Sequence, residues 1–208
     1  MNPRLKRLLP ALAAGLLAVA AGLGLLQQRA ASQPGPQPAA FVSGPGEHFP
    51  SQGHCHIGQG CPPRPDDYAR YPYNSDPPTS GPHQERFPTQ FINPGVLPNR
   101  ILVHLMEHTN VVLLYNPNTA GALADHLRDY AVQYDEPFSH LMTPQTPGAD
   151  VGEQLEQAQG VFVAPDPLLH HPIALVAWTR LQFLDTFDPT KIDAFVHAYV
   201  GNPQNAGQ

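Results

Sequence analysis

The 208-residue sequence has little charge, few aromatic residues and only two cysteines. Charged residues make up 13% of the chain and aromatic residues 8%, and no run of basic residues occurs beyond residue 29. The chain after residue 46 holds all 17 acidic residues and seven basic ones, a formal charge of −10. Because neutralisation of phosphates supplies most of the affinity of nucleic-acid-binding proteins, this balance excludes nucleic acid as a partner.

Proline and glycine are abundant, with 26 and 17 copies, but no Gly-X-Y period indicates collagen. Their share stays a little below the roughly 25–30% that is typical of unstructured low-complexity chains. From His48 to Pro98 the chain is still rich in proline, but it carries tyrosine and phenylalanine residues that can anchor ordered loops to a core. The segments expected to fold total about 160 residues, which is the size of one domain.

An uncharged apolar run extends over nineteen residues from Leu8 to Leu26. At 1.5 Å per residue it can cross a hydrocarbon core of roughly 30 Å. A cleaved signal peptide and an uncleaved anchor both fit this run. We favour the anchor, because the apolar part of a signal peptide usually has about 7–15 residues and because Arg29 and Pro38 occupy the −3 positions of the best-placed cleavage sites.

The charges that flank the run predict its orientation. Arg4, Lys6 and Arg7 outnumber the single Arg29 on the other side, and the side with more basic residues stays in the cytoplasm. We therefore expect a single-pass protein of the cell membrane. Its parts are a cytoplasmic N-terminus over residues 1–7, a transmembrane anchor over 8–26, a Pro-rich linker over 27–47 and an extracytoplasmic domain over 48–208.

Regular structure is predicted after residue 99. Short apolar runs predict strands over 111–115 and 160–164, and residues 173–184 predict two strands or one long bent strand. Residues 120–132 have the apolar spacing of an amphipathic helix with Thr119 as its N-cap. Residues 189–200 predict a second helix, with Asp188 as its N-cap and Gly201 directly after it.

This order of elements predicts an α+β fold, in which helices pack on a small mixed sheet behind the N-terminal transmembrane helix. The order is similar to the second part of a thioredoxin-like domain, which is an analogy at the level of the fold. The loop before the first helix reads Asn116-Pro117-Asn118-Thr119. It contains no cysteine, so dithiol chemistry at that place is excluded.

Cys55 and Cys61 are the two thiols. Outside the cytoplasm, two cysteines this close in a Gly-containing loop favour a disulfide. One alternative is a metal site in which His54, His56 and the two thiolates are ligands. Free thiols are the other alternative.

Two segments carry the most specific signal. One is Asp76-Pro-Pro-Thr-Ser-Gly-Pro-His83, and the other is His104-Leu-Met-Glu-His108. Together with the Ala174–Trp178 run, they resemble the bacterial domain of unknown function 3105 over roughly Tyr73 to Gly201. The resemblance implies a membrane-anchored extracytoplasmic domain whose biochemical role is not assigned. The family usually has a glycine where this chain has Thr109.

The His104–His108 segment has two interpretations that depend on its backbone. As a helix, it has the His-x-x-Glu-His pattern of metallopeptidases in which two histidines bind zinc and the glutamate activates water. As a strand, it would place His104 and His108 about 13 Å apart, which is too far for one ion.

His83 ends a stiff proline-rich loop and can complete a site with His104 or His108. Imidazoles with Met106 nearby suit copper or zinc better than calcium or magnesium. Glu107 is then expected to orient an imidazole from outside the ligand set. The alternative is that His83 and His104 bond to backbone carbonyls and fix the loop to the sheet.

These observations support a first hypothesis of an anchored domain that binds a transition metal through histidines, in metal handling or in the assembly of an envelope complex. The second hypothesis is a non-catalytic module that binds another envelope protein and whose histidines are structural. A metal-dependent hydrolase is the third, and enzymatic activity is the less favoured class.

Overall fold

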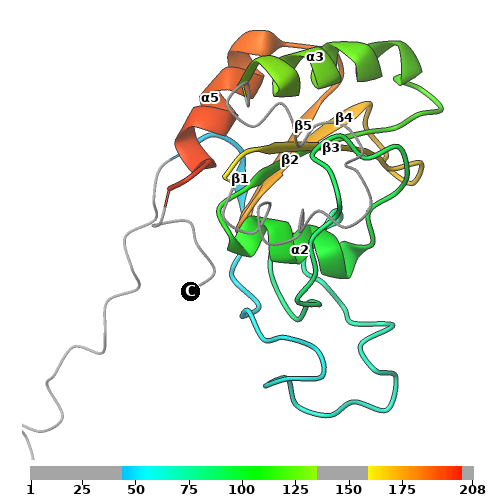
Figure 1. Cartoon of the computed structure of the whole chain (residues 1–208), viewed down its shortest axis with the longest axis vertical. Helices are drawn as coiled ribbons and strands as arrows, with labels where there is room; N and C mark the ends of the chain where they lie inside the picture. Colours follow the sequence, from blue (N-terminus) through cyan, green and yellow to red (C-terminus); the bar gives the residue numbers. More distant parts are fainter. Residues whose placement is uncertain (1–43, 135–158, 203–208) are drawn as a thin grey trace, which may run out of the picture. The chain divides into compact units, whose positions relative to one another are not determined.

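The computed structural model of the protein describes residues 44–134 and 159–202 (Figure 1). The predicted membrane segment and most of the predicted linker lie outside these residues. The strands are β1 (Glu47–His48), β2 (Val111–Tyr115), β3 (Val161–Pro165), β4 (Ile173–Ala177) and β5 (Arg180–Leu184). The helices are α2 (Asn99–Glu107), the short 3-10 helix η2 (Gly121–Leu123), α3 (Ala124–Tyr134) and α5 (Pro189–Tyr199).

The strands form one mixed sheet in the order β1-β5-β4-β2-β3. β2 is an interior strand, because it pairs in parallel with β3 and antiparallel with β4. The register places Leu113 opposite both Val163 and Leu175. β4 and β5 form an antiparallel hairpin, so residues 173–184 are two strands, and β5 pairs with the two-residue β1. The predicted α+β class with a small mixed sheet is confirmed.

The sheet is covered on both faces. Figure 1 shows α2 on one face, with α3 and α5 on the other. Alternate residues of a strand point to opposite faces. Accordingly, Val112 and Leu114 belong to the apolar cluster that includes the inner face of α2, whereas Val111 and Leu113 belong to the cluster with α3 and α5. All five residues of β2 are buried, which explains why its sequence is continuously apolar.

The helix boundaries agree with the sequence in one case and differ in another. Asp188 caps α5 by accepting a hydrogen bond from the Lys191 N–H at 3.1 Å. The prediction of Thr119 as an N-cap is wrong, since the 3-10 turn starts after Ala120 with no side-chain cap and α3 begins only at Ala124. The Thr119 and Ala120 N–H groups instead donate to the Asn116 carbonyl, forming a turn that delays the helix.

The segment before β2 is a helix, so the strand interpretation of residues 101–108 is wrong. α2 is buried from Ile101 to Glu107, because the sheet covers one side of it and residues 44–98 contact the other. We call residues 44–98 the N-terminal arm. The arm holds β1, and the rest of it is loops and turns. No helix within 44–134 and 159–202 has both the length and the apolarity needed to cross a membrane.

Candidate metal centre

The first two residues of the site lie on one face of α2. His104 and Glu107 are three positions apart, a spacing that places side chains on the same side of a helix. They face the arm, whereas Leu102, Leu105 and Met106 pack in the apolar cluster with the sheet. The His104 side chain is 1% exposed and the Glu107 side chain 8%. A buried carboxylate needs charged or hydrogen-bonding partners, and the arm supplies them.

The end of α2 is fixed just after Glu107. The Thr109 backbone has φ +62°, the left-handed region that a β-branched residue rarely adopts. The Asn110 amide then donates to the Leu105 carbonyl at 3.0 Å and accepts from the Gly160 N–H at 2.8 Å. These bonds join the last turn of the helix to the start of β3 and so hold the Glu107 backbone in place.

His83 reaches the site from a buried proline-rich loop. Thr79 and Ser80 are fully buried, and the Thr79 carbonyl accepts from the Thr179 N–H in the β4–β5 turn at 3.0 Å. Gly81 has φ +123°, and a Cβ at this position would lie 3.1 Å from the Tyr73 ring. Glycine is therefore required where the loop passes the ring. The His83 side chain, next to it, is 0% exposed.

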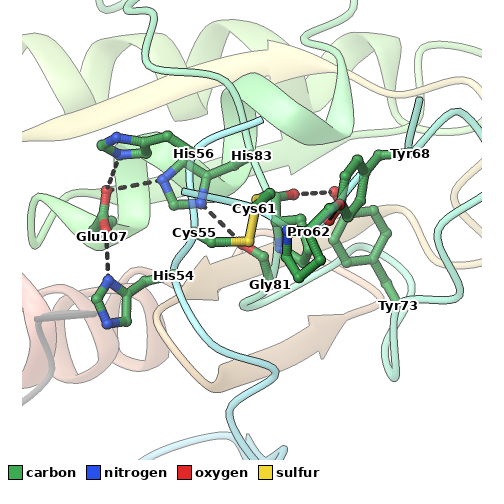
Figure 2. Close-up of a disulfide and its surroundings, with 11 residues drawn as sticks. His54, Cys55, His56, Cys61, Pro62, Tyr68, Tyr73, Gly81, His83 and Glu107 are labelled. Carbon is green, nitrogen blue, oxygen red and sulfur yellow. Dashed lines mark hydrogen bonds and ion pairs between the residues drawn. A yellow bond between two sulfur atoms is a disulfide. The ribbon is translucent and has the colours of Figure 1, made fainter. Parts of the chain in front are cut away.

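His56 comes from the segment of the arm that runs beside this loop. The Gly81 and His83 N–H groups donate to the carbonyls of Gly53 and Cys55, and the Ile57 N–H donates to the His83 carbonyl. Alternate side chains of an extended segment share a side. His54 and His56 therefore both reach Glu107, whereas Cys55 between them bonds to Cys61 (Figure 2). The predicted disulfide is confirmed, and the alternatives with cysteine ligands or free thiols are wrong.

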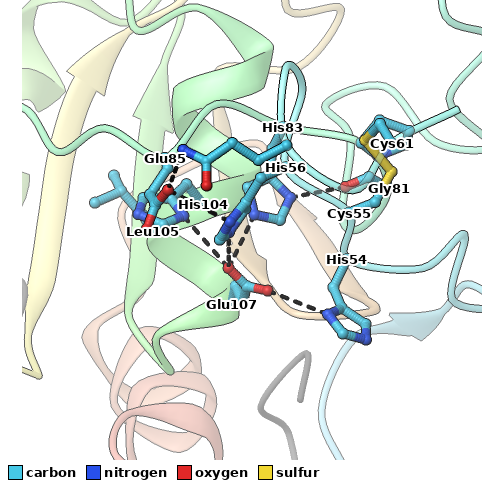
Figure 3. A network of polar contacts seen from close by, with 12 residues as sticks. His54, Cys55, His56, Cys61, Gly81, His83, Glu85, His104, Leu105 and Glu107 are labelled. Atoms are coloured by element: carbon cyan, nitrogen blue, oxygen red, sulfur yellow. Dashed lines mark hydrogen bonds and ion pairs between the residues drawn. A yellow bond between two sulfur atoms is a disulfide. The ribbon is translucent and has the colours of Figure 1, made fainter. Parts of the chain in front are cut away.

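Three imidazole nitrogens converge on one carboxylate oxygen (Figure 3). The Glu107 Oε2 atom lies 2.9 Å from His83 Nε2, 3.3 Å from His56 Nε2 and 3.3 Å from His104 Nδ1. These four atoms all lie within 4.8 Å of one another, so His56, His83, His104 and Glu107 form a group that can hold a metal ion.

The hydrogen bonds of His83 define what its Nε2 atom can do. Its Nδ1 lies 2.8 Å from the Gly81 carbonyl, which only accepts, so Nδ1 carries a proton. In the neutral ring, Nε2 then has a lone pair that faces a carboxylate oxygen. Such a pair of acceptors requires a positive centre between them, either a proton on Nε2 or a metal ion.

The surroundings of His104 give a second indication that a positive centre fits this site. Its Nδ1 atom is buried and has no hydrogen bond of acceptable geometry, although it lies 3.3 Å from Glu107 Oε2. An orphaned buried polar atom costs about 1–3 kcal/mol. Coordination of an ion by this nitrogen would remove that cost.

The electrostatics keep Glu107 ionised. Burial alone would raise the pKa of its carboxyl group, but the contacts with His104 and His83, and the positive charge of His83 when protonated, lower that pKa well below its ordinary value. The carboxylate is thus available as a negatively charged ligand at neutral pH and below.

The donor set and its spacing fit a small transition-metal ion. Four ligand atoms placed tetrahedrally about 2.0–2.1 Å from an ion are about 3.3 Å apart. The three distances from Glu107 Oε2 are close to this value, whereas the ligand atoms as a group lie within 4.8 Å of one another and would have to move slightly closer on binding. Three imidazoles and one carboxylate suit zinc and copper. The Gly81 carbonyl fixes the tautomer of His83, as outer partners of metal-bound histidines commonly do. Glu85 Oε2 lies 3.7 Å from His56 Nδ1, beyond hydrogen-bond distance.

The structure brings together some of the predicted site residues and not others. His83 and His104 lie in the group, and Glu107, expected to act from outside it, contributes a ligand atom itself. His108 is the C-cap of α2, with its ring against Phe87 and His104 at centroid distances of 5.1 and 4.7 Å. It is not among the four converging residues. Met106 is fully buried in the core, because the adjacent position on a helix turns to another face.

His56 enters the sequence analysis only in the Cys-ligand alternative. The signal that could have separated it from Cys55 is the His-Cys-His alternation itself, which in an extended segment sends the two imidazoles to one side and the thiol to the other. The arm is extended at His56 because residues 53–57 pair with residues 81–83, which lie more than 20 residues further along the chain.

The comparisons with known proteins agree with the resemblance seen in the motifs. A family model described as "Protein of unknown function (DUF3105)" matches residues 66–208. The chain belongs to this family. No curated protein and no solved structure matches it. His83, His104 and Glu107 lie within the matched residues, whereas His56 and both cysteines precede them.

Proposed function

We propose that this protein binds one zinc or copper ion through His56, His83, His104 and Glu107. The observation that carries the proposal is the convergence of three imidazole nitrogens and a carboxylate oxygen within 4.8 Å of one another. Two of those nitrogens, on His83 and His104, are almost completely buried. An ion here satisfies the orphaned Nδ1 of His104 and separates the lone pair of His83 from the carboxylate.

We further propose that the site serves metal handling, or the assembly of a membrane complex, in a domain held outside the cytoplasm. The uncharged run Leu8–Leu26 and its basic flank support a membrane anchor. The Cys55–Cys61 disulfide supports an oxidising compartment, because thiols stay reduced in the cytosol. Fusing a reporter after Gln208 tests the topology, since its activity is expected only outside the cytoplasm.

A thioredoxin-like arrangement is proposed for the part from β2 to α5. The strand order β3-β2-β4-β5, with β2 parallel to β3 and a closing hairpin before α5, supports it. The helix that carries His104 and Glu107 precedes β2, so the metal centre is built outside this arrangement.

Elemental analysis and metal titration of the full-length chain in mild detergent test the proposal. We expect one ion per chain, retained through gel filtration. Replacing His56, His83 or His104 with Ala is expected to weaken zinc or copper binding by about a hundredfold or more, because even outer partners of a ligand cost about 10–100-fold. His171→Ala is the control, since the His171 side chain is 44% exposed and its ring contacts the carboxylate of Asp185, at 3.2 Å, and the Phe183 ring, away from the four ligands.

The competing function is an interaction module in which the histidines are structural. The 2.9 Å contact of His83 with Glu107 favours it, because a protonated imidazole there would form a buried ion pair. In that case the alanine variants would leave metal uptake unchanged and destabilise the apo domain by about 1–3 kcal/mol each. Thermal unfolding in the presence of a chelator separates the two functions.

A further inference from the structure

The four converging residues leave one neighbouring histidine without a role. His54 Nδ1 lies 3.5 Å from Glu107 Oε1, whereas His56, His83 and His104 contact the other carboxylate oxygen, Oε2. We infer that His54 and Glu107 Oε1 form an outer station through which the metal ion enters and leaves the buried site. This inference rests on the proposed function.

The exposure of the histidines decreases stepwise toward the site. The side chain of His54 is 58% exposed and that of His56 28%, whereas those of His104 and His83 are 1% and 0% exposed. The two buried imidazoles come from the helix and the proline-rich loop, and the two accessible ones from the arm. Solvent therefore reaches the site from the side of His54.

The backbone presents His54 at that side without fixing its ring. The carbonyls of Gly53 and Cys55, on either side of His54, accept hydrogen bonds from Gly81 and His83. The position of the His54 backbone is thus set, while its side chain is 58% exposed and can therefore reach both water and the site. Glu107 connects the two stations, because one of its oxygens faces His54 and the other faces the three inner imidazoles (Figure 3).

An outer station lowers the barrier to ligand exchange. A hydrated ion that binds a buried site directly must lose several waters before it gains any ligand. At His54 it exchanges one water for Nδ1 and another for Glu107 Oε1, and the remaining waters leave as the inner nitrogens bind. His54 then returns to water. Because His54 is absent from the final ligand set, it accelerates binding and release equally and leaves the affinity nearly unchanged.

The test compares rates with affinity in the full-length chain. Co²⁺ binding, followed by its visible absorption in a stopped-flow instrument, gives the association rate, and transfer to EDTA gives the dissociation rate. We expect His54→Ala to slow both rates by about tenfold, a conservative figure for losing one positioned partner of a metal site. The Kd should change by less than about threefold, since every final ligand remains and the exposed 3.5 Å contact of His54 with Glu107 supports that ligand only weakly. His54→Glu, which restores an exposed ligand, should recover most of both rates.

His197→Ala is the matched control, since the His197 side chain is 63% exposed and its Nδ1 lies 3.3 Å from an Asp193 carboxylate oxygen. Unchanged rates in His54→Ala, or a weaker Kd with an unchanged association rate, would overturn the inference while the proposed function stands. Failure of the wild-type chain to bind Co²⁺, Zn²⁺ or copper would overturn the proposed function, and the inference with it.

Discussion

The N-terminal arm and the part of the domain built from the sheet and its helices are held in different ways. Residues 99–134 and 159–202, the sheet–helix part, supply nearly all the buried residues of the two apolar clusters, and the strands β2, β3 and β4 are fully buried. The arm has one two-residue strand and contributes Phe91 to one of these clusters. The rest of its hold comes mainly from a disulfide, tyrosine hydroxyls, backbone bonds and the cluster around Glu107. Burial of apolar surface is non-directional, so it tolerates small shifts in position. The polar bonds of the arm, in contrast, form only when particular donor and acceptor atoms lie at the right distance.

The candidate site lies where the two parts meet. His104 and Glu107 come from α2, and His56 and His83 come from the arm. A metal ion would therefore join the arm to the sheet–helix part, with a geometry that neither part has alone. This difference predicts an asymmetry: damage to the sheet–helix part should destroy the site, whereas damage to the arm should leave strands β2 to β5 intact.

The largest effect is expected from a cavity in the core. Phe162 in β3 is fully buried, and its ring lies 4.5 Å from that of Phe91 in the arm. Phe162→Ala should lower the free energy of unfolding by about 3–5 kcal/mol, measured by urea unfolding. Metal binding should weaken as well, because the arm packs on this core. The asymmetry would be contradicted if Phe162→Ala left stability unchanged or if the site survived after the sheet had unfolded.

The second effect concerns the disulfide. The double variant Cys55→Ser, Cys61→Ser opens a short loop, which on the loop-entropy model is worth about 2 kcal/mol. The His56 carbonyl accepts hydrogen bonds from the Cys61 and Gln59 N–H groups within that loop. Loss of the disulfide should therefore also weaken metal binding by about tenfold, as does the loss of other groups that support a metal ligand.

Amide hydrogen exchange of the double serine variant shows which residues lose protection when the disulfide is removed. Faster exchange is expected in residues 53–61, with β2 and β4 unchanged. Equal acceleration in the central strands would mean that the arm supports the sheet, against the asymmetry. The same measurement on the wild-type protein after chemical reduction is a control for the serine substitutions themselves.

Much of the sheet–helix part could be predicted because apolar periodicity reports burial directly. The continuous run of β2 and the Asp188–Gly201 pattern of α5 each contain their own signal within a few residues. The start of α3 escaped prediction because the Asn116 turn, set by backbone bonds to the Asn116 carbonyl, overrides the capping preference of Thr119.

The site could be predicted only in part, for a related reason. His104 and Glu107 share a local motif, and His83 follows a stiff loop, so each has a signal of its own. The role of His56 depends on pairing between residues 53–57 and 81–83, which no local pattern encodes. The difference between Met106 and Glu107 depends on the rotation of α2 against the sheet, which the short helix alone does not fix.

A smaller effect is expected where the arm meets α5. The Tyr199 hydroxyl donates to the Pro45 carbonyl at 2.6 Å, and burial raises the pKa of this hydroxyl. Tyr199→Phe keeps the ring in the core and removes only that bond, so it should cost about 1 kcal/mol. Tyr130→Phe is the control, since its bond to Asp193 is exposed. Equal losses in the two variants, measured by urea unfolding, would mean that the contact with the arm adds nothing.

The smallest effect isolates the charge at the start of α5, within the sheet–helix part alone. The Lys191 backbone N–H bonds to Asp188 and the Lys191 ammonium lies 3.4 Å away, so the pKa of Asp188 is lowered. Asp188→Asn keeps a good N-cap residue and removes the charge.

Because the folded-state pKa of Asp188 lies below its unfolded value, the charge stabilises the domain at a pH above that unfolded value. This stabilisation is lost as the pH falls through the folded pKa. The wild-type protein should therefore melt at a slightly higher temperature than Asp188→Asn at about pH 6. The difference in melting temperature should begin to narrow below about pH 3.8, the ordinary pKa of Asp, and vanish below the folded pKa. Other groups titrate alike in both proteins and cancel in the difference. If the difference in melting temperature between the two proteins did not change with pH, the effect of Asp188 would come from its hydrogen-bond geometry and not from its charge.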